Sequence, residues 1–564
     1  MNIYYTALNL LILVALAVMI RYGWHRFRYF LQMFQQSGYK LNEYREWLSR
    51  NLLHRAITPE HFWLLVVITV LQYFTSSSIT ATAAALILGM FILFWFGKAG
   101  EFRPEREKKP LVYTSRMKRL SLLLAVLVLL PLLAVLDLSF SGRLLNSSIG
   151  LKGTAHHILI ADPWFLFFGL VFTDLLIPFL LPLAALFMKP VESGIHKGFM
   201  RKARKRLADL PNLRVIAITG SYGKTSVKYM IDTLLKERYS VCKTPGSYNT
   251  PMGICKVINN DLGSHHQVLI LEMGARYEGN IAELCGITKP DIAMVTNVGV
   301  AHLETFGSKE VIAREKSTLA RELKPGGTLV LNSDDEIVSS WASLRNDVEV
   351  VMAGLNGGSV QARDIEHDAE GTRFDMQWQE TDGSYSSHEV RIKLLGRHNV
   401  CNFLLAAATA QAMGLRPETV ALAAGRIEPV PHRLELKRLN GIIVIDDAFN
   451  SNPTGAANAL EALTSIGSGR KILITPGMIE LGTEQERENR EFGQKIAAAK
   501  PDLVLLVGRE QTNPILEGIR EKGGDGIDVR IVSSLFEANE LLSGYAAPGD
   551  VVLYENDLPD SFNE

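Results

Sequence analysis

The chain has 564 residues, enough for roughly three or four domains of about 150 residues each. Its 59 basic and 59 acidic residues cancel to a formal net charge of zero, which gives no support to a general nucleic-acid binder. The four cysteines have no metal-ligand spacing, which favours reduced core thiols in a cytosolic compartment over a zinc site.

Apolar residues concentrate in the first third of the chain, where five stretches are long enough to cross a bilayer. They lie at approximately 3–21, 62–78, 79–97, 120–137 and 163–187. The first has no basic start and no evident small-residue cleavage site, so it does not resemble a signal peptide. Asp174 is the one ionisable residue well inside a span, and we interpret it as a polar contact between helices rather than a transport site. The alternative is a set of buried helices in a large soluble protein.

Basic residues gather in the loops on one side of these spans, within 21–55, 98–119 and 189–206. The opposite loops carry only Arg143 and Lys152. The excess of positive charge on the inner side predicts an outside N-terminus and a cytoplasmic C-terminal two-thirds, as in an integral protein of the bacterial plasma membrane. We interpret the basic run 201–206 as a solvated juxtamembrane stretch that contacts anionic membrane lipid.

From about Leu213 the pattern changes to alternating strands and helices. A β-branched run, Leu213–Thr219, predicts a buried strand, and Val227–Leu235 has helical periodicity. Between them stands Gly220-Ser221-Tyr222-Gly223-Lys224-Thr225-Ser226. Glycines let the backbone wrap a phosphate, the lysine neutralises it, and a hydroxyl can bind Mg²⁺. The run is not a full GxxxxGK[ST] motif, because Ile218 stands where the first glycine would be; its position between a strand and a helix still predicts a nucleotide-phosphate loop.

Two further polar residues follow predicted strands. Glu272 ends the strand that begins at Val268, and His302 follows the strand Ile292–Thr296. Ligands of open α/β sheets lie beyond the carboxyl ends of strands, and a carboxylate and an imidazole there can hold Mg²⁺ near the loop. Taken singly, Glu272 could be a surface acid and His302 a helix-capping or core histidine.

The order of these motifs resembles the Mur ligase family, and within it the MurF group, which joins D-alanyl-D-alanine to a UDP-muramoyl tripeptide. The resemblance covers about 210–555. The segments that carry it are ITGSYGKTS (218–226), SYNTPMG (247–253), LEMGARYEGNI (271–281), TNVGVAHLETFGS (296–308), AREKS (313–317), HNVCN (398–402), PHRLE (431–435) and DDAFNSNP (446–453).

The resemblance implies roles for single residues around ATP and two Mg²⁺ ions. Lys224 matches the phosphate-loop lysine and Thr225 the threonine that binds Mg²⁺. Glu272 matches the glutamate ligand of Mg²⁺, and His302 the histidine at the second ion. Lys316 falls where the family has a lysine carbamylated by CO₂; without the family it would be a helix-surface lysine.

The resemblance also implies contacts with the nucleoside part of ATP. Asn399 and Asn402 match positions near the adenine, and Asp447 matches the acid that holds the ribose, with Asn450 beside it. Arg433 matches an arginine that reaches the ATP phosphates from a hinge between domains. Read alone, Asn402 would be a buried helix polar group and Arg433 a salt-bridged linker residue.

The predicted fold class is an α-helical membrane domain followed by α/β structure. We expect a membrane domain over 1–205, a central P-loop-type ATPase domain over 206–432 and a C-terminal Rossmann-like domain over 433–564, with strands near 442–446, 471–475, 503–507, 529–532 and 550–554. The turn-rich stretch 349–394 predicts a small β-hairpin insert of the central domain. We expect closure of the domains about the linker near 428–440.

The chain departs from the MurF pattern in three places. Membrane spans stand where the family has its UDP-sugar domain. Lys316-Ser317-Thr318 replaces a Lys-Gly-Glu motif, and Glu555-Asn556-Asp557 stands where the group has a Lys-Gly-Ser type segment. These changes affect the expected substrate more than the ATP half of the reaction.

The leading hypothesis is a membrane-anchored, MurF-like ligase that activates a carboxylate as an acyl phosphate for attack by an amino acid or dipeptide. Its partners would be a small-molecule or lipid-linked peptide or sugar precursor, the amine, and membrane lipid, with no nucleic acid. The alternatives are a ligase for a lipid-linked or polyglutamate-like acceptor and an inactive membrane nucleotide-binding scaffold.

Overall fold

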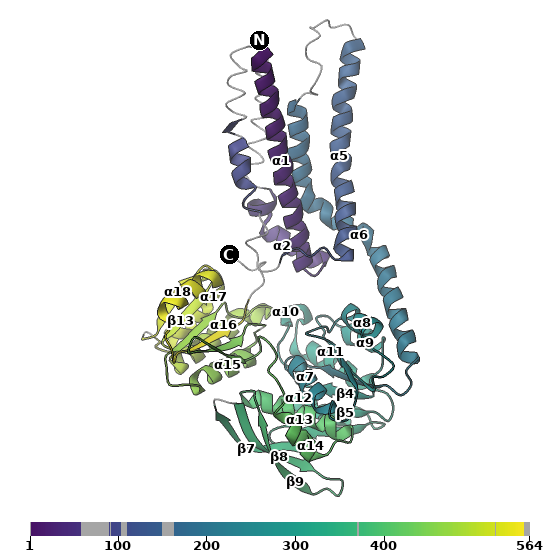
Figure 1. The fold of residues 1–564 in the computed structure, drawn as a ribbon, viewed down its shortest axis with the longest axis vertical. Helices are drawn as coiled ribbons and strands as arrows, with labels where there is room; N and C mark the ends of the chain where they lie inside the picture. The colour runs from purple at the N-terminus through teal and green to yellow at the C-terminus, as the bar shows by residue number, and fades with distance from the viewer. Residues whose placement is uncertain are drawn as a thin grey trace. The chain divides into compact units, whose positions relative to one another are not determined.

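The computed structural model describes residues 2–57, 89–90, 92–102, 110–148, 163–368, 371–449, 451–524 and 526–557. These residues form two compact units, Met1–Ile195 and His196–Leu558. The first is helical, and the second contains two β-sheets with their covering helices (Figure 1).

The first unit consists of helices that range from five to 46 residues in length. They are α1 (Asn2–Gln36), α2 (Leu41–Arg50), the π-helix η1 (Leu52–Ala56), α5 (Ser115–Ser148) and α6 (Pro163–Ala208), which continues into the second unit. Predicted spans 3–21, 120–137 and 163–187 lie within α1, α5 and α6, whereas 62–78 and 79–97 fall largely outside the described residues. Among the residues searched, two helices are apolar and long enough to cross a membrane, Ser115–Ala134 and Gly169–Ala208, with mean hydropathies of 2.1 and 2.2.

A buried ion pair joins α1 to α6 within this unit. The guanidinium of Arg26, which is 0% exposed, lies 3.0 Å from the carboxylate of Asp174. Its remaining N–H groups donate to the carbonyls of Arg55 at 2.8 Å and Ala56 at 2.9 Å. Because a buried charge needs both a partner and hydrogen bonds, these contacts explain how Asp174 is accommodated. They agree with the predicted contact between helices.

The larger sheet of the second unit has the strand order β2-β3-β1-β4-β5-β6-β7-β8-β9. Its strands are β1 (Arg214–Thr219), β2 (Val241–Lys243), β3 (Val268–Glu272), β4 (Ile292–Val295), β5 (Thr328–Asn332), β6 (Glu349–Ala353), β7 (Val360–Asp368), β8 (Gly371–Gln379) and β9 (Tyr385–Ile392). The first six in this spatial order pair in parallel. Their carboxyl ends therefore meet at one edge, and β1, β3 and β4 bring the predicted site residues there.

Helices cover both faces of this sheet, as the alternation of buried side chains along β1 requires. Ile216 and Ile218 pack with one set of helices, and Val215 and Ala217 with the other. The first set is α7 (Lys224–Leu235), α13 (Arg397–Ala412) and α14 (Pro417–Ala424). The second is α8 (Pro251–Asn260), α9 (Asn280–Cys285), α11 (Lys309–Arg321) and α12 (Glu336–Ser339); the short α10 (Leu303–Phe306) and 3₁₀-helix η3 (Ser340–Ser343) lie between these elements in sequence.

The end of α6 packs on the second set, although four of the six residues in the basic run 201–206 are exposed, as predicted for a solvated stretch. Ala203 is fully buried in that core. Arg204 donates to the carbonyl of Gly286 at 2.7 Å, and Arg206 donates to the carbonyl of Leu262 at 2.9 Å. These arginines satisfy carbonyls at the ends of α9 and α8, where positive charge is favourable.

The stretch 349–394 was predicted as a small β-hairpin insert of the central domain. Its hairpins are confirmed in β7–β9, but the stretch also contains β6, and all four strands belong to the larger sheet. Strand β6 belongs to the parallel part of the sheet, and β7 follows it with the single parallel pair Ala353–Val360. Strands β7, β8 and β9 then continue the same sheet as an antiparallel meander. The meander buries Phe374 and Trp378 in the same core as α13, so it completes the sheet instead of standing apart from it.

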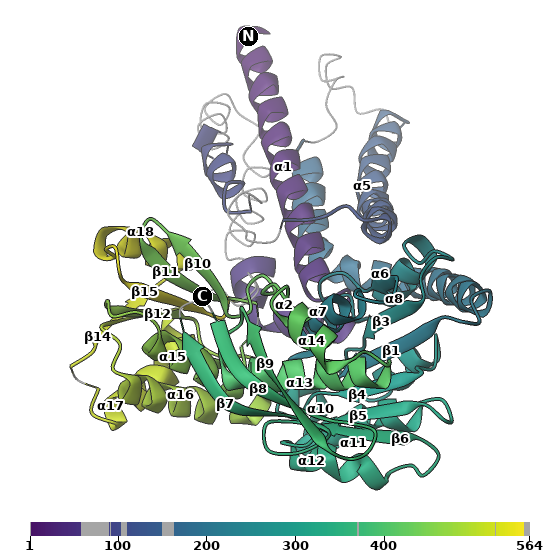
Figure 2. The same cartoon turned by 60° about the horizontal axis from the view of Figure 1, so that its bottom comes forward.

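The smaller sheet has the order β10-β11-β15-β12-β13-β14, with only β10 antiparallel. Its strands are β10 (Glu435–Leu439), β11 (Ile442–Asp447), β12 (Lys471–Thr475), β13 (Leu503–Val507), β14 (Asp528–Val532) and β15 (Val551–Glu555). The five strands predicted from the sequence are confirmed, and β10 was missed. Figure 2 shows α15 (Pro453–Ser465), α16 (Gln485–Ala499) and α17 (Arg509–Glu521) on one face and α18 (Leu535–Tyr545) on the other.

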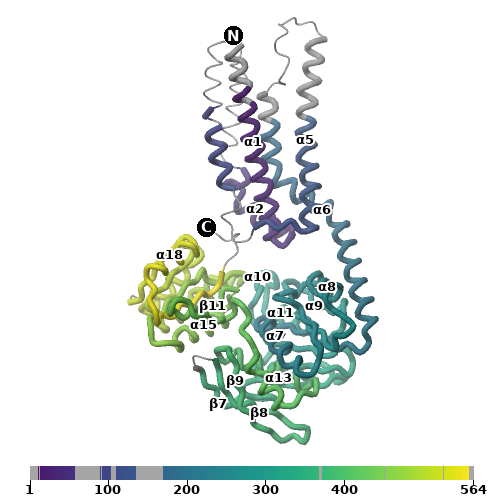
Figure 3. The backbone as a smooth tube through the Cα atoms, viewed as in Figure 1, coloured from purple at the N-terminus to yellow at the C-terminus, as the bar shows by residue number. Residues whose placement is uncertain are grey.

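The two sheets are connected by one segment, residues 425–434, which links α14 to β10 (Figure 3). His432 and Leu434 have positive φ values of 61° and 48° in this segment. Such backbone is costly for residues other than glycine and is maintained by surrounding contacts. The segment contains Arg433, so its path decides where that side chain can reach.

Candidate active site

The predicted phosphate loop turns from β1 directly into α7. Gly223 is the left-handed N-cap of this helix, with φ 79°, and Lys224 is its first residue. The lysine ammonium donates to the loop's own carbonyls, at 2.7 Å to Gly220 and 3.1 Å to Ser221. Burial lowers the pKa of Lys224 to about 8. A phosphate at this helix N-terminus would meet free N–H groups, the helix dipole and this ammonium together.

The loop is fastened to the segment that follows β4. Thr296 Oγ1 donates to the carbonyl of Tyr222 at 2.6 Å, and the Tyr222 N–H donates to Asn297 Oδ1 at 2.9 Å. Ser221 Oγ accepts from the Gly299 N–H at 2.8 Å. The path of the loop is therefore fixed by β4 before any ligand binds, which is the preorganisation that an anion site needs.

Gly220 leaves no space for a side chain, and this makes a testable prediction. Its φ is +148°, and a Cβ added there would lie 1.9 Å from Thr296 Oγ1. We expect Gly220→Ala to displace the loop, to cost about 1–3 kcal/mol of stability, and to weaken ADP binding at least tenfold in calorimetry. Gly425→Ala is the control, because a Cβ there meets nothing within 4 Å. Equal ADP affinities of the two variants would show that the loop does not bind phosphate.

Glu272 is a fully paired, buried carboxylate at the end of β3. It accepts hydrogen bonds from Thr225 Oγ1 at 3.0 Å, from Lys228 Nζ at 2.9 Å and from Asn249 Nδ2 at 3.1 Å. Burial alone would raise its pKa, but the charges of Lys228 and Lys224 outweigh this and lower it. Glu272 is therefore ionised at neutral pH.

The pair of Thr225 and Glu272 fits a magnesium site. Their oxygens are 3.0 Å apart, close to the separation of about 3 Å between neighbouring ligands of an octahedral Mg²⁺ with bonds of about 2.1 Å. Lys228 is 0% exposed in its side chain and already neutralises Glu272. Because Lys228 already pairs with Glu272, a Mg²⁺ ion would interact with only part of the negative charge of this carboxylate.

Lys316 lies on α11 and is only 4% exposed. Among the residues that the structure describes, no carboxylate lies within ion-pair distance of its ammonium. Burial, reinforced by the positive charge of Lys224, lowers the pKa of Lys316 well below its usual value. A lowered pKa increases the fraction of the neutral amine at any given pH, and the neutral amine is the form that reacts as a nucleophile.

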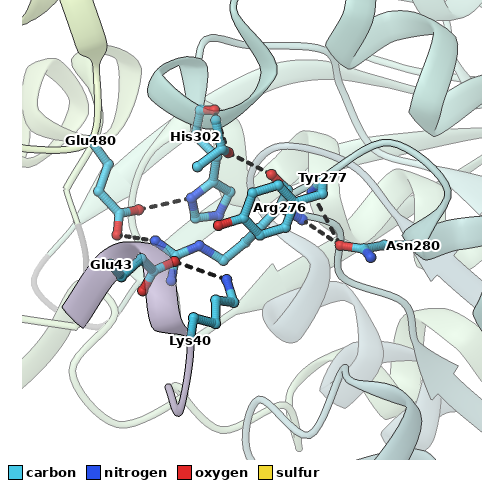
Figure 4. Close-up of polar contacts among 8 residues, drawn as sticks. Lys40, Glu43, Arg276, Tyr277, Asn280, His302 and Glu480 are labelled. Carbon is cyan, nitrogen blue, oxygen red and sulfur yellow. Dashed lines mark hydrogen bonds and ion pairs between the residues drawn. The ribbon is translucent and has the colours of Figure 1, made fainter. Parts of the chain in front are cut away.

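His302 is held by a carboxylate from the smaller sheet. Its Nδ1 lies 2.8 Å from Glu480 Oε2, and the other oxygen of Glu480 accepts from Arg276 Nη2 at 2.6 Å (Figure 4). Since a carboxylate accepts, Nδ1 is the protonated nitrogen, and the lone pair of Nε2 is left for another ligand. Burial lowers the pKa of His302 despite Glu480, so its neutral form is favoured.

Asn399 and Asn402 lie in the first turns of α13, both buried. Asn399 Nδ2 donates to the carbonyl of Leu395 at 2.8 Å. Asn402 lies against the phosphate loop, because a Cβ on Gly223 would come within 2.5 Å of its Oδ1. The two amides are therefore next to the loop, where a bound nucleotide would be within reach of polar side chains.

Arg433 and Asp447 meet at the connection between the sheets. The Arg433 guanidinium stacks 4.3 Å over the ring of Phe449, and burial lowers its pKa. Asp447 accepts from the Leu434 N–H at 3.1 Å, and burial with repulsion from Glu555 raises its pKa to about 7. Asn450, predicted beside Asp447, lies outside the described residues.

A second group of possible metal ligands lies around β10 and β11 of the smaller sheet. His432, Glu435 and Asp446 bring their ligand atoms within 4.8 Å of one another. The ammonium of Lys437 already binds both carboxylates, at 3.0 Å to Glu435 and 2.5 Å to Asp446. We therefore interpret this group as an ion-pair network that fastens β10 to β11, and not as a metal centre.

Lys224 is the common neighbour of the predicted site residues. Its charge interacts with Glu272 and Arg433, and it contributes to the lowered pKa values of Lys316 and His302. Side chains from separate stretches of the chain thus converge at the carboxyl edge of the larger sheet.

The sequence reasoning missed four members of this site: Lys228, Asn249, Arg276 and Glu480. Lys228 stands four residues after Lys224 on the same helix face, a spacing that could have indicated it. Glu480 follows the carboxyl end of β12, where polar residues of α/β sheets gather.

Comparisons with known proteins agree with this geometry. Residues 218–410 match the family described as Mur ligase middle domain, and residues 432–554 match Mur ligase, glutamate ligase domain. The chain is 31% identical over 347 residues to the UDP-N-acetylmuramoyl-tripeptide–D-alanyl-D-alanine ligase of Bacillus subtilis (strain 168), covering 61% of this chain and 72% of that protein. It is 34% identical over 362 residues to the ligase of the same name from Mycobacterium tuberculosis (strain ATCC 25618 / H37Rv), covering 60% and 70%.

Among solved structures, the chain is similar to the MurF ligase of Thermotoga maritima in complex with ADP. The TM-score is 0.57 and the identity 26%, over 64% of this chain and 80% of that one. The matched regions contain every predicted site residue from Gly220 to Asn450.

Proposed function

Since this chain belongs to the Mur ligase family and is an ATP-dependent, ADP-forming peptide ligase of the MurF type, we propose that it joins an amino acid or dipeptide to a cell-wall precursor at a membrane. The relatives named above act on a UDP-muramoyl tripeptide and D-alanyl-D-alanine. The same amine, D-alanyl-D-alanine, is the first candidate for this chain. The observation that carries the proposal is the phosphate loop between β1 and α7, where Lys224 begins the helix and Thr225 Oγ1 donates to Glu272 at the end of β3 at 3.0 Å.

The chemistry explains why such a site needs cations. A carboxylate is a poor electrophile, so its oxygen first attacks the γ-phosphorus of ATP, and ADP leaves. The amine then attacks the acyl phosphate, and inorganic phosphate leaves from the tetrahedral intermediate. Negative charge develops on oxygen in both steps, and fixed cations stabilise it. Lys224 would provide this charge from the loop and Arg433 from the connection.

Mg²⁺ and a carbamate complete the proposed site. Thr225 and Glu272 would hold one Mg²⁺ and His302 a second. Such ions neutralise the charge of the phosphates when bound. The neutral amine of Lys316 would add to CO₂ and release one proton, which gives a buried carbamate anion compatible with a cationic site. Asn399, Asn402 and Asp447, with Asn450, would bind the adenine and the ribose.

We also propose that the first unit anchors the enzyme in the membrane. Support comes from the two apolar helices Ser115–Ala134 and Gly169–Ala208 and from the one-sided basic loops, which favour a ligase on the cytoplasmic side, where ATP is. We expect the full chain to stay in the membrane pellet after a sodium carbonate wash that releases a peripheral control protein. Recovery of the chain in the supernatant would contradict anchoring.

A lipid-linked acceptor is the second candidate. The family matches begin only at residue 218, and apolar helices precede them, so the acceptor could be held at the membrane in place of a separate sugar-binding domain. The two candidates are separated by supplying membranes that contain the protein with ATP, D-alanyl-D-alanine, and either a UDP-linked or a lipid-linked muramoyl peptide. Mass spectrometry then identifies which acceptor gains the dipeptide. Failure of both acceptors to gain it would contradict a muramoyl-peptide ligase.

A further inference from the structure

Glu480 is the residue through which the smaller sheet contacts the proposed metal site. It follows β12, 178 residues beyond its partner His302. Its carboxylate contacts two side chains of the larger sheet's loops, Arg276 after β3 and His302 after β4. Figure 4 shows the carboxylate between the imidazole and the guanidinium, with one oxygen toward each. One acidic side chain thus connects two loops that follow neighbouring parts of the sheet.

The backbone on both sides of this contact is held in an unusual conformation. His302 has φ 59° and Glu480 has φ 64°. Left-handed backbone costs a residue other than glycine free energy that other contacts must offset, and it clusters at functional sites. The two strained residues face each other, so their contact contributes to keeping both in place.

Close packing fixes the approach of the two segments independently of the ion pair. A Cβ added to Gly482 would lie 3.3 Å from Glu304 Cα and 3.4 Å from its backbone nitrogen. The loop that contains Glu480 therefore rests on the backbone next to His302.

The partner side of the contact is held equally firmly. Thr305 Oγ1 donates to the Arg276 carbonyl at 2.5 Å and the Arg276 N–H donates to Asn280 Oδ1 at 3.1 Å. Asn280 begins α9, and Glu315, the neighbour of Lys316, accepts from the Gly279 and Ile281 N–H groups at 2.7 Å each. Arg276 is thus connected through α9 to the helix that contains Lys316.

We propose that Glu480 is a positioning residue that sets the orientation and tautomer of His302 when the two sheets are together. It accepts from Nδ1, which directs the lone pair of Nε2 toward the proposed cation, and Arg276 fixes the carboxylate in that pose. The metal site is then complete only when the smaller sheet brings Glu480 to it. This inference rests on the proposed function, because it takes His302 as a metal ligand.

The test measures metal binding directly in the full-length protein in detergent. Mn²⁺ binding in the presence of ADP is followed by electron paramagnetic resonance for the parent, Glu480→Ala and Glu480→Gln. Loss of a partner that orients a metal ligand typically costs 10–100-fold in metal affinity. We expect that loss for Glu480→Ala and a smaller one for Glu480→Gln, whose amide oxygen can still accept from Nδ1. ADP affinity measured in EDTA should stay within twofold of the parent.

Glu484→Ala is the matched control, because Glu484 lies on the same loop and, in the part of the chain that the structure describes, pairs with the exposed Arg487. It should bind Mn²⁺ like the parent. Equal Mn²⁺ affinity of the parent and both Glu480 variants overturns the proposal, and so does an equal loss in Glu484→Ala. If the parent itself binds neither ADP nor Mn²⁺, it is the proposed function that fails. Glu480→Gln keeps the shape of the side chain, so it tests the proposal even where Glu480→Ala does not fold.

Discussion

Lys224→Ala is expected to reduce kcat/KM for ATP by about 1,000-fold, at the upper end of what removing one preorganised electrostatic contact costs. The ammonium of Lys224 stands at the N-terminus of α7, bound only to the carbonyls of Gly220 and Ser221 among the described contacts, so it can turn to a phosphate without breaking an ion pair. Its neighbours include the cation Arg433, which explains why a residual rate should remain. ADP release, followed in a coupled assay, measures the effect.

Lys236→Ala serves as its control. Lys236 is the C-cap residue at the other end of α7, where its exposed side chain pairs with the buried carboxylate of Asp232. Its loss should leave turnover within twofold of the parent. Comparable rates for Lys224→Ala and Lys236→Ala would contradict the binding of the ATP phosphates by the phosphate loop.

Lys316→Ala is expected to lower kcat by about 100- to 1,000-fold, with a smaller effect on KM for ATP, because the carbamate would act on the reacting phosphate and not on the nucleoside. In protein incubated with ¹³C-bicarbonate, the parent should show a carbamate carbon signal in the NMR spectrum that the variant lacks. Lys309→Ala is the control, since Lys309 begins the same helix and is exposed. A parent without the signal, or a fully active Lys316→Ala, would contradict the carbamate.

The direction of the pH effect on this carbamate follows from the lowered pKa of Lys316. CO₂ reacts with the neutral amine. Raising the pH through the lowered pKa increases the neutral fraction in the folded protein at a pH where an ordinary lysine is still charged. Carbamate occupancy at a fixed CO₂ concentration should therefore rise with pH, and it should do so at a lower pH than for an exposed lysine.

Several parts of the fold could be predicted because they depend on local pattern. Strand β1, the phosphate loop and α7 follow from a β-branched run, two glycines and helical periodicity within 22 residues, from 214 to 235. The hairpins of β7–β9 could be predicted from the turn-rich sequence. Their place in the larger sheet could not, because they attach to it through the single pair Ala353–Val360. Strand β10, Glu435–Leu439, was missed because ELKRL is an edge strand with two charged basic residues and little buried surface.

The residues of the candidate site also divide into those that a local sequence pattern indicates and those that it does not. Lys224 and Glu272 are marked by their position at strand ends, and the roles of Lys316 and Arg433 came only from the family resemblance. Glu480 was missed although it follows the carboxyl end of β12, because its role depends on a contact with His302, 178 positions away in the sequence. Lys228 was passed over because a lysine on a helix usually faces water, whereas this one is buried against Glu272.

The departures of the chain from the MurF pattern bear on the substrate more than on the chemistry. Glu555 ends β15 and is fully buried, where Thr475 Oγ1 donates to it at 2.5 Å and Ser451 Oγ also donates to it. It thus orders three segments around Asp447 instead of offering a charge to the solvent. The departures therefore do not involve the polar side chains that we propose bind the nucleotide.

The transfer of oxygen from the acceptor carboxylate to phosphate tests the central claim most directly. An acceptor labelled with ¹⁸O in its carboxylate is incubated with the full-length protein, ATP and the amine, and the released inorganic phosphate is analysed by mass spectrometry. Because the acyl phosphate forms through a carboxylate oxygen that later leaves with phosphorus, we expect one ¹⁸O in each phosphate released. Amide product formed together with unlabelled phosphate would contradict activation of the carboxylate by ATP.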